Sequence, residues 1–305
     1  MENKIVVNGV NKSFKNHHVL AGVDLTVSSG SIYALLGANG SGKSTLLKII
    51  TGLHDMDTGE VTVNGLELTR NLRQIRQTFS LNSQTSTTDG VLTGFENLQL
   101  IAKLRHLPDP TKVADDLLNQ FDLTDARDRR VAAYSGGMQR RLDIAMSLVG
   151  EPEILFLDEP TTGLDPKSRN DLWEVILDLK RRGKTIFLTT QYLEEADQLA
   201  DQIGFLQNGH IVATGTPSEM KKLGGHSRLQ LILPNTDAIE SAVKLLSDFD
   251  ISEQEDGSLM VNLDAGVSTS LKVLTLLSTH NIPLSSFQVL APTLDDTFMQ
   301  LIKGA

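Results

Sequence analysis

A glycine-rich segment at residues 37–45, GANGSGKST, carries the residue types that bind phosphate. Its glycines allow backbone conformations closed to other residues, so several N–H groups can point at one anion. Lys43 adds a positive charge for the β- and γ-phosphates of a nucleotide, and the Ser44 hydroxyl is suited to ligate Mg²⁺. The segment predicts a P-loop whose phosphate-binding residues are Gly37, Asn39, Gly40, Gly42, Lys43, Ser44 and Thr45.

Two adjacent carboxylates, Asp158 and Glu159, follow the apolar run of residues 154–157. The run predicts a buried strand, and neighbouring side chains of a strand point to opposite sides. We therefore expect one carboxylate to face a Mg²⁺ ion and the other to face an attacking water. The alternative is a strand end with two solvated acids, and the P-loop in the same chain favours the functional interpretation.

Two further segments have both a functional and a structural interpretation. Residues 135–137, Ser-Gly-Gly, directly precede a predicted helix, where they form either a second anion site or an ordinary N-cap. Phe14 lies on a polar, turn-like segment. Its ring either stacks on a nucleotide base or packs on the protein surface.

Strands and helices alternate in the way needed to hold these residues together. The run at residues 32–36 predicts a buried strand entering the P-loop, and residues 46–50 predict the helix that leaves it. Further strands are predicted at residues 4–10, 23–27, 59–65, 79–84, 154–157, 185–190 and 203–206. Helices are predicted after a polar loop at 85–90 as far as residue 121, and at 138–149, 169–181 and 193–200. The alternation indicates an α/β fold with a mostly parallel sheet covered on both faces.

The pattern changes from about residue 224 onward. Strands are predicted at residues 229–233, 251–255, 258–263 and 286–290, and helices at 237–246, 271–277 and 294–302. Asp256 and Gly257 form a strong hairpin signal between two of the strands. The βαββαβ order predicts a small ferredoxin-like α+β domain without catalytic residues. We expect it either to regulate or stabilise a dimer or simply to pack on the core.

Length, composition and charge exclude several classes of protein. The 305 residues are 40% hydrophobic and include no cysteine, which excludes disulfides and thiolate metal sites. The 7 histidines show no zinc-ligand spacing. No apolar run approaches the ~18 residues that span a bilayer, and residues 1–4 do not begin a signal peptide, so we expect a soluble chain. The net charge of −10 argues against nucleic-acid binding, and we interpret the basic clusters at 127–130, 140–141 and 180–182 as solvated helix faces.

Taken in the order in which they occur along the chain, the motifs of residues 3–223 resemble those of the ATP-binding cassette (ABC) ATPases. The GANGSGKST segment is similar to the Walker A loop, and residues 154–160 (ILFLDEP) are similar to Walker B. Residues 134–138 (YSGGM) resemble the signature motif, a variant of the usual LSGGQ. Gln84 stands at the Q-loop position, and residues 163–165 (Gly-Leu-Asp) stand at the D-loop position.

The resemblance implies a P-loop NTPase fold of the ABC type, with a parallel core sheet, an antiparallel β subdomain and a helical subdomain at about residues 90–150. It places the nucleotide-binding domain at residues 1–223 and the small accessory domain at residues 224–305. It also implies that two copies of the chain sandwich two ATP molecules.

The resemblance assigns a role to each motif residue. Phe14 stacks on adenine, and Mg²⁺ is held at Ser44, Gln84 and Asp158. Lys43 neutralises phosphate charge, and Glu159 is the general base. The residues implied to contact ATP from the second copy are Ser135, Gly136, Gly137 and Asp165.

One position departs from the family pattern. Many members have histidine where this chain has Gln191, and that histidine contacts the γ-phosphate. A glutamine amide can donate a hydrogen bond there, but it cannot take up a proton. General-base catalysis is therefore expected to depend on Glu159.

Gln191, the YSGGM motif and residues 84–98 also resemble the daunorubicin-resistance branch of drug exporters. That branch implies an ATPase that binds a separate integral-membrane permease on the cytoplasmic face of the cell membrane, with Gln84 and residues 85–100 near the permease. The alternatives are an ABC ATPase that exports lipid, polysaccharide, peptide or ions, and a soluble ABC ATPase of translation or DNA maintenance. The single cassette and the lack of sustained heptads disfavour the soluble class.

Overall fold

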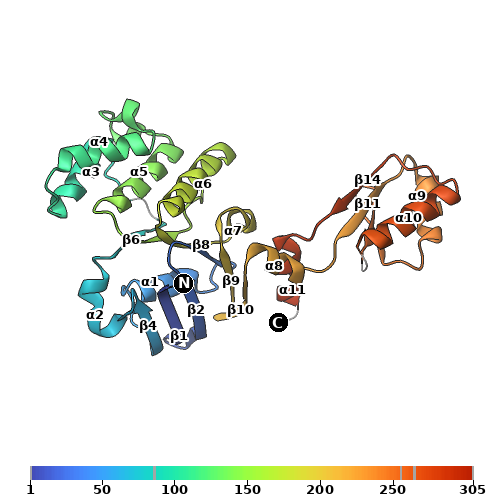
Figure 1. Cartoon of the computed structure of the whole chain (residues 1–305), viewed down its shortest axis with the longest axis horizontal. Helices are drawn as coiled ribbons and strands as arrows, with labels where there is room; N and C mark the ends of the chain where they lie inside the picture. Colours follow the sequence, from blue (N-terminus) through green and yellow to red (C-terminus); the bar gives the residue numbers. More distant parts are fainter. Residues whose placement is uncertain (1, 85–86, 255, 264–265, 304–305) are drawn as a thin grey trace. The chain divides into compact units, whose positions relative to one another are not determined.

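A computed structural model describes residues 2–84, 87–254, 256–263 and 266–303, in two compact units, Met1–Pro217 and Ser218–Ala305 (Figure 1). The sequence placed this boundary after residue 223, whereas the structure joins most of helix α8 (Pro217–Leu223) to the second unit. The reason is a buried contact with helix α11 (Leu294–Lys303). Met220 is fully buried, and its carbonyl oxygen accepts a 2.7 Å hydrogen bond from Thr297 Oγ1.

A six-stranded sheet in the order β10-β9-β3-β8-β7-β6 forms the centre of the first unit. Its strands are β3 (Ile32–Leu36), β6 (Phe79–Asn82), β7 (Ile154–Asp158), β8 (Thr185–Thr190), β9 (Gln202–Gln207) and β10 (His210–Gly215). Strands β6, β7, β8, β3 and β9 pair in parallel, and β10 pairs antiparallel to β9. Every residue of β3, β7 and β8 is buried, which confirms the predicted parallel sheet covered on both faces.

A second, antiparallel sheet has the order β2-β1-β4-β5 and packs against helix α1 (Lys43–Ile50). Its strands are β1 (Asn3–Phe14), β2 (His17–Ser28), β4 (Thr58–Val63) and β5 (Leu66–Glu67). Side chains from both sheets and from α1 form one apolar cluster, which includes Val7, Val23, Leu46 and Phe156. The α1 helix is thus held between the two sheets, and the P-loop begins at its N-terminus.

Helices form a separate group within the first unit, shown in green in Figure 1. They are α3 (Gly94–Leu104), α4 (Pro110–Gln120), α5 (Gly136–Leu148) and, beside them, α6 (Pro166–Arg181). The predicted start at Asp109 and Pro110 is confirmed, because the Asp109 side chain accepts a hydrogen bond from Lys112 N and caps α4. Helices α2 (Leu68–Ile75) and α7 (Leu193–Leu199) also belong to this unit. Along the described residues, no helix combines the length and the apolar character that a membrane crossing requires.

The second unit contains an antiparallel sheet in the order β12-β13-β11-β14. Its strands are β11 (Arg228–Ile232), β12 (Ile251–Glu253), β13 (Leu259–Asn262) and β14 (Ser286–Leu290), with helices α9 (Thr236–Leu245) and α10 (Val267–Thr279). Strand β13 lies between β11 and β12, which confirms the predicted ferredoxin-like arrangement. The predicted strand end at residue 255 lies outside the described residues. The predicted end at residue 263 is described, and the two residues after it are not.

The second unit has its own apolar core. Substitutions at two neighbouring residues of β11 can test how much this core contributes to stability. Leu231 is fully buried in this core, whereas Ile232 is 44% exposed. We expect Leu231→Ala to lower the free energy of unfolding of this unit by about 2–5 kcal/mol, because it leaves a cavity. Ile232→Ala should change it by less than about 0.5 kcal/mol. Urea denaturation of the full chain measures both, and equal effects would contradict the assignment of the core.

Candidate functional site

The P-loop connects β3 to α1, and its shape depends on glycine. Gly40 and Gly42 adopt φ values of 82° and 109°, which strain residues with a side chain. A Cβ atom on Gly42 would also lie 2.9 Å from the Val19 carbonyl oxygen, and one on Gly37 would lie 2.5 Å from the Leu206 carbonyl oxygen. The backbone can therefore form this loop at the N-terminus of α1, where helix N–H groups favour an anion.

The Lys43 ammonium lies over this loop. Its Nζ atom donates hydrogen bonds to the carbonyl oxygens of Gly37, at 2.8 Å, and Ala38, at 3.1 Å, and it lies 3.6 Å from Glu159 Oε1. Burial lowers the pKa of Lys43 from its ordinary value, and the Glu159 carboxylate opposes this change. The charge is thus held in place next to the phosphate cradle.

Ser44 and Asp158 bring two oxygen ligands together. Ser44 Oγ donates a 3.1 Å hydrogen bond to Asp158 Oδ1, which also accepts one from Thr189 Oγ1 at 2.5 Å. Mg²⁺ is usually bound by one or two carboxylates together with substrate phosphates. The described residues contain no group of three or more His, Cys, Asp or Glu suited to a metal. This pair, facing a phosphate cradle, fits a nucleotide-associated Mg²⁺.

Glu159 corrects the expectation that the two carboxylates point to opposite sides. Strand β7 ends at Asp158, and Glu159 has a left-handed φ of 47°. The alternation rule of a strand therefore does not apply to it. Its Oε2 accepts hydrogen bonds from Gln84 Nε2 at 3.4 Å and from Thr162 Oγ1 at 3.2 Å. Both carboxylates consequently lie beside the P-loop, and the alternative of two solvated acids is wrong because both are buried.

A cavity of about 490 Å³ lies in front of these groups. The predicted residues that line it are Asn39, Gly40, Gly42, Lys43, Ser44, Thr45, Gln84, Glu159 and Gln191. Residues from four segments far apart in the sequence thus meet at one cavity. Val19 and Thr162 also line it and were not predicted.

The structure places the other predicted residues outside this cavity. Phe14 is 44% exposed near the end of β1, with its ring 5.8 Å from that of His54. Ser135 accepts a hydrogen bond from Met138 N and caps α5, and Asp165 accepts one from Ser168 N and caps α6. Hydrogen bonds from Ser168 lower the pKa of Asp165.

The two caps lie next to each other. A Cβ atom on Gly137 would lie 2.6 Å from Ser168 Oγ. Gly136 is exposed beside it. Ser135, Gly136, Gly137 and Asp165 therefore form one surface of the chain and not part of its own cavity.

Arg140 corrects a further expectation. The sequence suggested a solvated basic pair at residues 140–141, but the structure buries Arg140 and leaves it 8% exposed. Spacing along α5 gave no signal that separates Arg140 from Arg141. Thr189 was also missed as a partner of Asp158, because it lies inside a strand of uniformly buried residues.

Comparisons with known proteins agree with this geometry. Residues 20–162 match the ABC transporter family. The chain is 40% identical to the daunorubicin resistance ATP-binding protein DrrA2 of Streptomyces coeruleorubidus, over 95% of this chain and 92% of that protein. This chain belongs to the ABC transporter ATP-binding proteins. As a member of that family it binds ATP and is an ATPase.

Two other known proteins are similar to this ABC ATPase. It is 32% identical to the linearmycin resistance ATP-binding protein LnrL of Bacillus subtilis, over 96% of both chains. Its fold is similar to that of the ATP-binding cassette MJ0796, solved as a dimer in a post-hydrolysis state with ADP and Pi. That similarity has a TM-score of 0.63 at 26% identity and covers 70% of this chain and 98% of the other. DrrA2 and LnrL are both named as resistance ATP-binding proteins, and the MJ0796 cassette shares the fold of this chain.

Gly42 provides a test of the phosphate cradle. We expect Gly42→Ala to weaken ATP binding at least about tenfold, equivalent to 1.4 kcal/mol, because the added methyl group strains the loop and meets a backbone carbonyl. Titration with a fluorescent ATP analogue measures the change. Gly65→Ala is the matched control, since Gly65 also has a positive φ, of 71°, but has no atom within 4 Å of an added Cβ. It should cost about 1–2 kcal/mol of stability and leave affinity unchanged.

Proposed function

We propose that this ABC ATPase powers the export of drug- or antibiotic-type compounds through a separate integral-membrane permease, bound at the cytoplasmic face of the cell membrane. ATP closes a dimer of two copies, and hydrolysis releases it. The observation that carries the proposal is the convergence of Lys43, Gln84 and Glu159 on one cavity, while Ser135 to Gly137 lie outside it. The cavity of a single copy is thus lined by hydrolytic groups of that copy but not by the donors of its own signature motif.

The exposed cap of α5 supports the binding of a second copy. Ser135 and Gly136 are exposed at the N-terminus of this helix, where N–H groups and the helix dipole favour an anion. In the proposed dimer they contact the γ-phosphate of ATP held by the partner's P-loop, and Asp165 lies beside them. Only ATP carries that phosphate, so binding drives closure and hydrolysis reverses it. Phe14, which is 44% exposed, is proposed to stack on the adenine.

The phosphoryl transfer is proposed to depend on positioning and charge neutralisation. Ser44, Asp158 and Gln84 would hold Mg²⁺, which supplies charge compensation at the phosphates when it is bound. Lys43 compensates charge from the side of the P-loop. Glu159 takes the proton of the attacking water, because Gln191 lines the same cavity but has no group that accepts a proton at neutral pH.

The permease is proposed to dock along α3 and the groove beside it, extending the expected contact at residues 85–100. Residues 85 and 86 lie outside the described residues. Leu100 and Leu104 are 45% and 66% exposed on α3. The buried residues of α3 include Asn97, Leu98 and Ala102, and the helix packs on α4 and α5.

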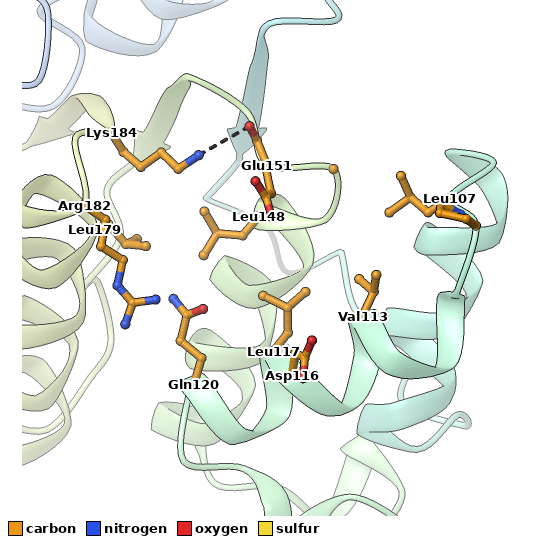
Figure 2. Close-up of a pocket in the computed structure, with 12 residues that line it drawn as sticks. Leu107, Val113, Asp116, Leu117, Gln120, Leu148, Glu151, Leu179, Arg182 and Lys184 are labelled. Carbon is orange, nitrogen blue, oxygen red and sulfur yellow. Dashed lines mark hydrogen bonds between the residues drawn. The ribbon is translucent and has the colours of Figure 1, made fainter.

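The groove in Figure 2 has a volume of about 610 Å³, and Leu107, three residues after the end of α3, is one of the residues that line it. Val113, Leu117 and Leu148 form its apolar floor. Charged side chains form its rim, with Lys184 Nζ donating a 3.3 Å hydrogen bond to the Glu151 carbonyl oxygen. An apolar floor with a charged rim suits a short amphipathic helix.

Glu159 provides the test of the ATPase mechanism. We expect Glu159→Gln to lower the ATP hydrolysis rate by at least roughly 10²–10⁴-fold, because the amide cannot take the proton. ATP binding should survive, and the variant should accumulate as an ATP-bound dimer in light scattering. Gln191→His is the control and should retain turnover. Hydrolysis by Glu159→Gln at the wild-type rate would exclude the proposed base.

Leu104 provides the test of the permease. A tagged chain purified from gently solubilised membranes should recover a polytopic membrane protein in roughly equal amount. We expect Leu104→Asp to lower that recovery about tenfold, a change of 1.4 kcal/mol in binding, and to leave basal ATPase activity unchanged. Val212 is 40% exposed on the edge strand β10, so Val212→Asp is the matched control. Recovery of ribosomes or DNA-associated proteins without a membrane protein would favour the soluble class instead.

A further inference from the structure

Arg140 donates hydrogen bonds to the backbone at the end of β7. Its Nε donates to the Pro160 carbonyl oxygen at 2.6 Å, and its Nη2 donates to those of Asp158 and Glu159 at 3.3 and 3.2 Å. The planar guanidinium presents five N–H donors in a fixed fork. One buried side chain therefore holds three consecutive carbonyl groups.

The segment that Arg140 holds is strained. Glu159 has a φ of 47°, and a residue with a side chain in this region costs on the order of 1–3 kcal/mol unless the surroundings determine it. On its N-terminal side, Glu159 N donates to the carbonyl oxygen of Thr189 at 3.1 Å and is 3.2 Å from Thr189 Oγ1. On its C-terminal side, Arg140 binds its carbonyl group. These two residues fix the conformation that turns the Glu159 carboxylate into the cavity.

A fourth hydrogen bond extends the contact to the Q-loop. Arg140 Nη1 donates to the Ser83 carbonyl oxygen at 3.2 Å, directly before Gln84. Arg140 itself belongs to α5, the helix that Ser135 caps. One guanidinium thus connects the helix of the signature motif to the two segments that carry Gln84 and Glu159.

We propose that Arg140 is the positioning residue that holds Glu159 in its strained, productive conformation and ties it to the signature helix. The proposal rests on the proposed role of Glu159 as general base. Every hydrogen bond that Arg140 donates within the described part of the chain ends on a backbone carbonyl. Its contribution is therefore the geometry of the backbone at Glu159, and not contact with the reacting atoms.

The first test replaces the fork and keeps the charge. A lysine carries its three N–H donors on one nitrogen, so it cannot reproduce the fork in which separate nitrogens bind Ser83 and residues 158–160. A small displacement of a catalytic group can cost roughly 10²-fold in rate. We expect Arg140→Lys to lower kcat by about this factor and to change KM for ATP by less than about twofold. Arg140→Gln, which retains two N–H donors, should lose less than Arg140→Met, which retains none.

Arg141 is the matched control on the same helix. Its Nη1 donates to the carbonyl oxygen of Phe121 and lies 3.3 Å from Asp122 Oδ2, away from Glu159. We expect Arg141→Lys to leave kcat within about threefold of the wild type, since surface changes away from a site have small effects. Equal losses for Arg140→Lys and Arg141→Lys would overturn the proposal.

A double variant separates positioning from other roles. If Arg140 acts through Glu159, Arg140→Lys should lower the residual rate of Glu159→Gln no further, because the two effects are not additive. A further fall of the same size would overturn the proposal while leaving Glu159 as the base. Wild-type turnover by Glu159→Gln alone would overturn the proposed function instead. ATP affinity and the unfolding midpoint of each variant show whether the fold is intact, and a loss of both in every Arg140 variant would assign Arg140 to stability alone.

Discussion

The parallel alignment of β6, β7, β8 and β3 is the constraint on which the rest of this protein depends. The carboxyl ends of parallel strands meet at one edge of a sheet, and ligands bind in the crevice outside that edge. Gln84 follows β6, Glu159 follows β7, Gln191 follows β8 and the P-loop follows β3. Segments that are far apart in the sequence, some by more than a hundred residues, therefore meet at one cavity.

Charge is balanced inside that cavity. Lys43 and Glu159 are both buried, and each lowers the cost of burying the other. Asp158 is compensated differently, by the hydroxyl groups of Ser44 and Thr189. A bound nucleotide would bring further negative charge to the same place, where the Lys43 ammonium can compensate it.

In the proposed function, different surfaces of the protein contact different partners. The cavity faces the P-loop, whereas the Ser135 cap of α5 lies outside it and suits a second copy. Exposed leucines on α3 and the adjoining groove suit a membrane partner. Helix α5 relates these surfaces to the hydrolytic site, because it begins at Ser135 and carries Arg140, whose hydrogen bonds reach the backbone at Glu159. A movement of α5 would therefore displace the backbone that positions the Glu159 carboxylate.

The sequence alone determined the P-loop, the family and most of the strands and helices, because glycine patterns, apolar periodicity and caps act over a few residues. It did not predict α2, β5, β10 or α8. Only the tertiary structure decided the direction of Glu159, the burial of Arg140 and the exposed face of α3. The reason is that each depends on groups distant in the chain. Glu159 leaves its strand with a positive φ because Thr189 and Arg140 bind its backbone on either side. No local pattern records such contacts, so spacing predicted alternating carboxylates and a solvated arginine where the fold produces neither.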